Sequence, residues 1–335
     1  MNIKSLLLGS AAALLAVSGA RAADAVVVAE PEPMEYVRIC DVYGAGFYYI
    51  PGTETCLKIG GLVRYQIDFD NDELGEVTDG LGGLDEGWNK SVLARISFDA
   101  RSETEYGTFK RYIQINATTG GTTLRHAYFE LGGLLVGHTD TLYDGDLGGE
   151  FDWAGGARVN QIRYTFDAGN GISVSLGTEV AVNNDSYVPN IVGKVSIAQG
   201  WGGVDLFAAY DSVVEEYALK AIANFKATEA LTLQLMATYG SDYSFYATAF
   251  DSGNAYEWSL GGYLSYAVND KLSIGAGGQY FAEEFSSSGD DWAIGAVVDY
   301  KIVENLNAKL AVNYTDGDNF TDGVTSGFLR LDASF

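Results

Sequence analysis

Proline is scarce in this chain of 335 residues, and the positions where it is missing are informative. Three of the four prolines (Pro31, Pro33 and Pro51) precede residue 56, and Pro189 is the only one after it. Because proline cannot donate a backbone hydrogen bond to a strand ladder, this distribution favours one long, continuous β-sheet after residue 56.

Basic residues and histidines are scarce as well. Lys and Arg number 20 against 45 Asp and Glu, so the chain lacks the basic surface that a nucleic acid partner requires. His126 and His138 are the only histidines, and no Gly-x-Ser-x-Gly or His-x-x-x-His motif accompanies them. We therefore expect no enzyme, no cofactor and no metal site.

Long apolar runs are also missing, because none after the N-terminus could span a membrane as a helix. Residues 1–22 have the pattern of a secretory signal peptide. Lys4 precedes a short uncharged run that is too short for a transmembrane anchor. The small residues of Ala20-Arg21-Ala22 then predict cleavage before Ala23.

Residues 23–55 are predicted to be a periplasmic lead-in that ends in a disulfide-closed segment. Residues 23–35 are small, acidic and proline-containing, which is typical of a flexible stretch. Cys40 and Cys56 are the only cysteines, and an exported chain meets an oxidising compartment, so we predict one disulfide between them. Its closed loop would contribute about 3 kcal/mol in the chain-entropy model. A metal site is the alternative, but no nearby His or third Cys supports it.

From residue 56 to residue 335 apolar and polar residues alternate with a period of two, which predicts β-strands with one apolar face. Most runs reach about ten residues, the length that a tilted strand needs to cross a bilayer. About sixteen strands are predicted, starting near Cys56, Trp88, Thr104, Thr122, Leu134, Arg158, Gly171, Asn190, Trp201, Glu215, Leu231, Ala255, Lys271, Asp291, Leu306 and Val324.

The connections between these strands alternate between tight turns and long acidic loops, such as Asp70–Gly87, Thr139–Gly156 and Phe281–Asp290. Short turns on one side and long loops on the other are typical of an all-β, transmembrane antiparallel β-barrel, here over residues 56–335. A soluble β-sandwich is the alternative, but it does not require aromatic residues at the strand ends. Such residues recur here, as membrane interfaces favour: Phe69, Phe98, Tyr239, Tyr266, Tyr280, Tyr300 and Tyr314.

The last strand ends on an aromatic residue. Leu329, Leu331, Ala333 and Phe335 alternate onto the apolar face. A terminal phenylalanine on that face looks like the signal that the barrel assembly machinery reads, so we assign Phe335 as an assembly signal.

The long loop Thr139–Gly156 holds acidic residues and no basic one. A polar segment at membrane depth is tolerated only in a wet lumen, so we predict that this loop folds into the pore and constricts it. An ordinary exposed surface loop is the alternative. The acidic residues are Asp140, Asp144, Asp146, Glu150 and Asp152.

Strand alternation places several arginines on the lumen wall, where each stays charged at any relevant pH. Acid on the loop opposite base on the wall would set a transverse field that filters ions. The alternative for each arginine is a local pair with Asp68 or Asp99. The predicted basic wall consists of Arg64, Arg95, Arg125 and Arg163.

The segments VRICD (37–41) and GAGFYYIPGTETCLKIGG (44–61) contain the two cysteines, and they resemble the start of the alphaproteobacterial outer-membrane porins. The resemblance continues at lower density, as a strand pattern, to Phe335. It implies sixteen strands, a third external loop folded into the pore and a homotrimer in outer-membrane lipid and lipopolysaccharide. The implied function is a passive, water-filled channel for small hydrophilic solutes and ions. A channel selective for sugars or other nutrients is the alternative, and it would need a run of aromatic side chains along the lumen.

Overall fold

The structure is a computed structural model that describes residues 38–70, 88–181, 187–250 and 254–335. It divides the chain into two units, Met1–Arg38 and Ile39–Phe335, and the fold below is that of the second unit. The predicted signal peptide, residues 23–37 of the lead-in and residues 71–87 of the first long loop lie outside the described residues.

Sixteen long strands occur among the described residues, and each is antiparallel to its neighbours. They are β2 (Cys56–Asp70), β3 (Trp88–Thr104), β4 (Gly107–Thr118), β5 (Gly121–Leu131), β6 (Leu134–Asp140), β7 (Arg158–Asp167), β8 (Ile172–Val180), β9 (Asn190–Gln199), β10 (Gly202–Asp211), β11 (Glu216–Lys226), β12 (Leu231–Gly240), β14 (Asn254–Ala267), β15 (Leu272–Glu284), β16 (Asp291–Val303), β17 (Leu306–Gly317) and β18 (Val324–Ser334). Two short strands, β1 (Tyr48–Tyr49) and β13 (Thr248–Phe250), pair with β2 and β14.

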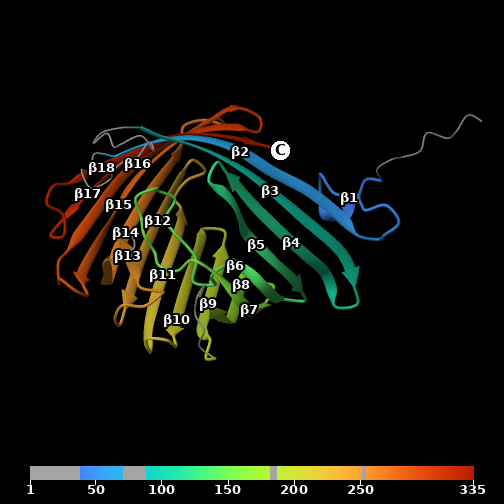
Figure 1. Cartoon of the computed structure of the whole chain (residues 1–335), viewed down its shortest axis with the longest axis horizontal. Helices are drawn as coiled ribbons and strands as arrows, with labels where there is room; N and C mark the ends of the chain where they lie inside the picture. Colours follow the sequence, from blue (N-terminus) through green and yellow to red (C-terminus); the bar gives the residue numbers. More distant parts are fainter. Residues whose placement is uncertain (1–37, 71–87, 182–186, 251–253) are drawn as a thin grey trace, which may run out of the picture. The chain divides into compact units, whose positions relative to one another are not determined.

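The sheet closes on itself, because β9 pairs with β10 and β18 pairs with β2 (Figure 1). At the seam, Gly61 N donates to Phe335 O at 3.2 Å and Phe335 N donates to Gly61 O at 3.0 Å. The predicted all-β, sixteen-stranded antiparallel barrel is therefore confirmed. Within the described ranges, no helix is long and apolar enough to cross a membrane.

Two predicted boundaries were wrong by a few residues. The strand expected to start near Thr104 starts at Gly107, because Thr104 still pairs with Gly107 across a two-residue turn. The loop expected to begin at Phe281 begins after Glu284, because β15 extends further with alternating burial. Neither shift changes the order or direction of the strands.

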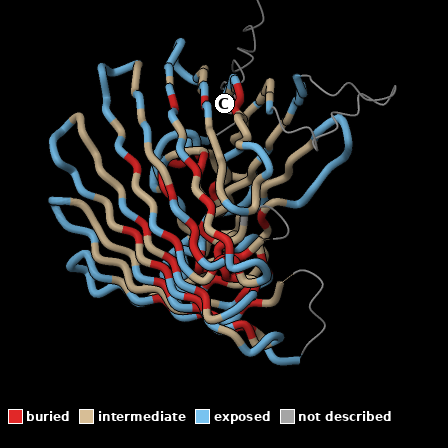
Figure 2. Tube along the Cα trace, turned by 90° about the vertical axis from the view of Figure 1, so that its left-hand side faces the viewer, coloured by how far each residue is buried: buried red, intermediate tan, exposed pale blue. Residues whose placement is uncertain are grey.

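Exposed and buried positions alternate along the strands, as Figure 2 shows. On β11, Tyr217 and Leu219 are exposed on the outer face, while Lys220 and Ile222 are buried on the inner face. The period of two thus gives the barrel an apolar outside and a lumen lined by the other face.

Aromatic pairs mark both ends of the barrel wall. At the ends that lead to long loops, the ring centroids of Phe69 and Trp88 are 5.4 Å apart, and those of Trp292 and Tyr314 are 5.5 Å apart. Near the short turns, Trp201 stacks on Phe225 with centroids 5.7 Å apart. Two such rows are the aromatic girdles that anchor a barrel at the two membrane interfaces.

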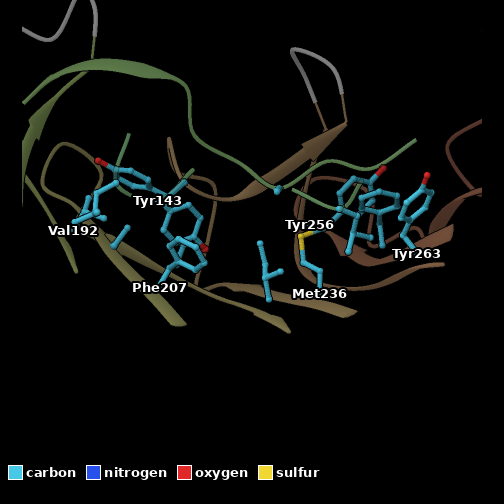
Figure 3. Packing of buried hydrophobic residues seen from close by; sticks show 14 of the residues in the cluster. Tyr143, Val192, Phe207, Met236, Tyr256 and Tyr263 are labelled. Carbon is cyan, nitrogen blue, oxygen red and sulfur yellow. The ribbon is translucent and has the colours of Figure 1, made fainter. Parts of the chain in front are cut away.

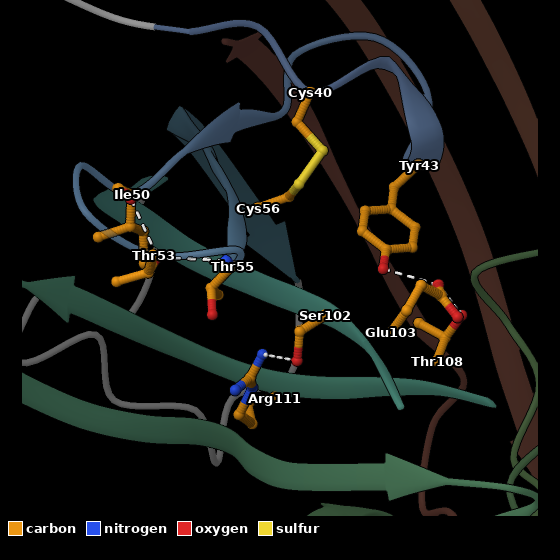
Figure 4. The surroundings of a disulfide bond; sticks show 10 residues. All are labelled: Cys40, Tyr43, Ile50, Thr53, Thr55, Cys56, Ser102, Glu103, Thr108 and Arg111. Atoms are coloured by element: carbon orange, nitrogen blue, oxygen red, sulfur yellow. Dashed lines mark hydrogen bonds between the residues drawn. A yellow bond between two sulfur atoms is a disulfide. The ribbon is translucent and has the colours of Figure 1, made fainter. Parts of the chain in front are cut away.

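The N-terminal part of the second unit is tied to the start of β2 (Figure 4). The predicted disulfide between Cys40 and Cys56 is confirmed, with Cα atoms 6.0 Å apart. Tyr43 Oη donates a hydrogen bond to Glu103 Oε1 at 2.7 Å, which links this segment to the end of β3. The guanidinium of Arg101 lies 5.1 Å from the ring centroid of Phe47 and adds a cation–π contact.

Candidate functional site

The loop between β6 and β7, residues 141–157, lies inside the barrel. Its backbone bonds to inward-facing amides of three strands on the far wall. Gln234 Oε1 of β12 accepts from Gly148 N at 2.6 Å. Gln279 of β15 accepts from Trp153 N at 2.9 Å through its Oε1 and donates to Trp153 O at 2.8 Å through its Nε2. Asn313 Nδ2 of β17 donates to Glu150 O at 2.7 Å. This is the third connection on the long-loop side, so the predicted third loop folded into the pore is confirmed.

Apolar packing fixes the loop against the wall. Figure 3 shows Tyr143 next to Val192 and Phe207, with Met236, Tyr256 and Tyr263 further along the same surface. Gly277 and Gly295 make a recess for one loop ring, because a Cβ on either would come within 3 Å of Phe151. The loop residues buried in this cluster are Leu142, Tyr143, Leu147, Phe151 and Ala154.

A buried carboxylate holds the start of the loop. Glu179 of β8 is fully buried and accepts hydrogen bonds from Thr141 Oγ1 at 2.5 Å, Leu142 N at 2.6 Å and Tyr246 Oη at 3.0 Å. Three donors satisfy the charge that burial would otherwise penalise. The loop therefore leaves the wall in a defined direction.

Three of the five acids predicted for the loop contact neighbouring residues, and one of them, Asp140, is the last residue of β6 rather than part of the loop. Glu150 Oε1 accepts from Lys309 Nζ at 2.9 Å and lies 3.6 Å from Arg330. Asp140 lies 3.5 Å from Arg158 and 3.9 Å from His126. Asp152 accepts from the backbone N–H of Leu147 at 2.6 Å, and burial raises the pKa of its carboxyl to about 7.

Asp144 and Asp146 are exposed to the lumen. The protein packed around them raises the pKa of both carboxyls, and the negative charge of Asp146 raises that of Asp144 further. In the described part of the chain no ion pair involves either residue. They are the loop acids that are exposed to the lumen, although both also interact electrostatically with Lys220 of β11.

The structure brings three of the four predicted arginines together on one side of the lumen. Arg64 forms a two-point ion pair with Asp332 at 2.7 and 2.8 Å. Arg95 donates to Asn116 Oδ1 at 2.9 Å and interacts electrostatically with Arg64 and Arg125.

Arg125 lies where β5 shifts register against β4, between the pairs Ile115↔Leu124 and Gln114↔His126. Its electrostatic neighbours include Asp144 of the loop, so its charge faces the lumen. Arg163 does not join this cluster, because it lies opposite Leu135 and Gly177, further toward the short turns.

Sequence reasoning missed four basic residues of this region: Arg158, Lys220, Lys309 and Arg330. Strand alternation could have found Lys309 and Arg330, because both fall on the polar face of their strands. Their partner in the loop, Glu150, is far away in the sequence, so no spacing rule connects them.

An aromatic-rimmed barrel of sixteen strands, whose charged lumen is narrowed by an internal loop, defines an outer-membrane channel protein of the porin class. The chain matches the family described as "Porin subfamily" over residues 24–330, and it belongs to that family. It is 36% identical over 381 residues to porin Omp2b of Brucella canis and 37% identical over 382 residues to porin Omp2b of Brucella suis biovar 1; both alignments cover 100% of each chain.

Solved structures share the fold at low sequence identity. The outer membrane channel DcaP of Acinetobacter baumannii aligns with a TM-score of 0.68 at 15% identity, over 86% of this chain and 99% of DcaP. The anion-selective porin of Comamonas acidovorans aligns with a TM-score of 0.65 at 13% identity, over 84% of this chain and 100% of that porin. The protein is thus an outer-membrane porin, a channel rather than a member of an enzyme family.

Proposed function

We propose that this porin is a general-diffusion channel, which passes small hydrophilic solutes and ions down their gradients and catalyses no reaction. The observation that carries this proposal is that the exposed loop acids Asp144 and Asp146 form no ion pair in the described part of the chain, while Arg125 of the wall interacts electrostatically with Asp144. Charges of opposite sign across a narrow, wet passage act on ions and dipoles without binding any one solute tightly.

The substrate-selective alternative would use lumen aromatics, and Tyr112 and Tyr128 form one such pair on the described part of the wall. Tyr112 and Tyr128 face the lumen with ring centroids 5.4 Å apart. Lys110 Nζ lies 5.5 and 5.0 Å from these two centroids and donates to Tyr128 Oη at 3.0 Å. Because an ammonium lies beside both rings and already bonds to the hydroxyl of Tyr128, the pair is a poor platform for a sugar, and this favours general diffusion.

The oligomeric state is proposed from a structural neighbour. A trimer form of OmpT from Vibrio cholerae aligns with a TM-score of 0.64 at 12% identity, over 84% of this chain. We propose a homotrimer for this chain, surrounded by outer-membrane lipid and lipopolysaccharide and inserted by the barrel assembly machinery through Phe335. Removal of residues 1–22 during export, and a periplasmic position for residues 23–55, belong to the same proposal.

Planar-bilayer recording of the purified protein tests the function. A general-diffusion channel gives stepwise conductance that no single sugar or nutrient blocks saturably. Saturable block by one solute would favour the selective channel instead, and a folded protein without conductance steps would contradict a pore of either kind.

A further inference from the structure

Lys220 of β11 is a charged side chain with almost no contact with water, since only 3% of its surface is exposed. Its Nζ donates to Gly145 O at 3.0 Å and to Ala154 O at 3.2 Å, so one ammonium joins the two arms of loop 141–157. The ring centroids of Tyr143 and Phe207 lie 4.3 and 5.0 Å from the same nitrogen.

A buried ammonium is unfavourable unless its donors are satisfied and its charge is balanced. Here two carbonyls take two of its hydrogen bonds, and two aromatic faces add cation–π attraction. The carboxylates of Asp144 and Asp146 interact electrostatically with Lys220, and they supply the balancing negative charge. The loop therefore surrounds this ammonium with the carbonyls of Gly145 and Ala154 and the ring of Tyr143.

We propose that Lys220 is the positioning residue of the constriction: its ammonium holds the two arms of loop 141–157 together and thereby fixes where Asp144 and Asp146 lie across the lumen. This inference rests on the proposed channel function. The inference goes beyond that function, because it assigns the positions of Asp144 and Asp146 to a buried wall residue that solutes in transit do not touch.

Lys194 of β9 provides a matched control. It carries the same charge, lies 4.7 Å from the ring centroid of Phe207 and interacts electrostatically with Asp144. Its ion pair, at 3.5 Å, is with Asp205 of the neighbouring strand β10 rather than with the loop. Lys194→Met therefore removes a nearby charge without removing the link between the loop arms.

The test compares Lys220→Met and Lys194→Met in planar bilayers. Lys220→Met keeps the apolar length of the side chain but leaves the carbonyls of Gly145 and Ala154 without their donor. We expect a several-fold increase in the current variance of the open state and a changed conductance step. Lys194→Met should shift only the reversal potential. Equal behaviour of the two variants would overturn the proposal, as would a Lys220→Met chain that yields no folded barrel, because the residue would then serve the wall rather than the loop.

Chemical rescue separates position from charge. Lys220→Ala leaves a space that propylammonium fills, and this ion is protonated at neutral pH like the lysine side chain. Propylammonium should return the open-state variance of Lys220→Ala to the wild-type value, whereas propanol should not. Equal rescue by propanol, or no rescue by propylammonium, would contradict the proposal that the ammonium of Lys220 holds the loop arms together. If the folded wild-type protein showed no conductance steps, the proposed channel function itself would be contradicted.

Discussion

Neutralising Asp144 and Asp146 together is the sharpest test of which charges an ion meets in this pore. The other acids predicted for the loop are engaged: Glu150 with Lys309, Asp152 with the loop backbone, and Asp140, at the end of β6, with Arg158. The variant Asp144→Asn/Asp146→Asn therefore removes the loop charges that are exposed to the lumen and keeps the shape of both side chains.

The size of the effect follows from Coulomb's law. A unit charge about 5 Å from an ion in water contributes about 0.8 kcal/mol, and salt at about 0.15 M reduces this to about 0.4 kcal/mol. Because the sign is opposite for cations and anions, the cation-to-anion permeability ratio should fall about fourfold per charge removed. In about 1 M salt the same charge should change the ratio less than about twofold.

The assay is the reversal potential across a salt gradient, measured at both salt concentrations. Asp316→Asn/Asp318→Asn is the control, since it removes the same charge at the end of β17 and in the connection that follows it, outside loop 141–157. We expect a large shift toward anions at low salt for the loop variant and a much smaller one for the control. If both variants shifted the potential equally, loop 141–157 would not line the constriction, although the pore would remain.

Three further predictions concern other parts of the chain. Non-reduced mature protein should give linked peptides containing Cys40 and Cys56 by mass spectrometry, and two free thiols would contradict the bond. Phe335→Ser should lower the amount of folded barrel in the outer membrane while export continues, because the Phe335 ring lies over Gly61 at the seam; unchanged amounts of heat-modifiable protein would contradict this. Because burial raises the pKa of Asp152 to about 7, a rise from about pH 6 to about pH 8 should ionise it and shift selectivity toward cations. Asp152→Asn should lose most of that shift, and an unchanged pH profile would show that another group titrates.

The strands could be predicted from the sequence because the period of two records which face meets lipid. Leu306 and Leu310 on one side of β17, with Asn307 and Lys309 on the other, assign the outer and inner faces directly. The strand ends were less accurate, as Thr104 shows, because a two-residue turn leaves little trace in an alternating pattern.

The site was harder to predict, because its contacts join residues far apart in the chain. Glu150 was recognised as a loop acid, but its partners Lys309 and Arg330 lie on the last two strands. Lys220 resembles any other polar residue on an inner face until the loop is placed over it. The apolar residues of the loop, among them Leu147 and Phe151, were the available sign that this loop is packed rather than solvated.

The packing of the loop also limits how the pore can be re-engineered. Removing residues 141–157 is the direct way to widen the passage. The deletion would, however, expose to water the apolar surface of the inner wall that the loop now covers. This surface includes Phe207, Ile222, Met236 and Phe281. Such a surface favours dewetting of the passage and attraction between unfolded chains. A wider pore from this scaffold therefore requires polar replacements on the wall at the same time as the deletion.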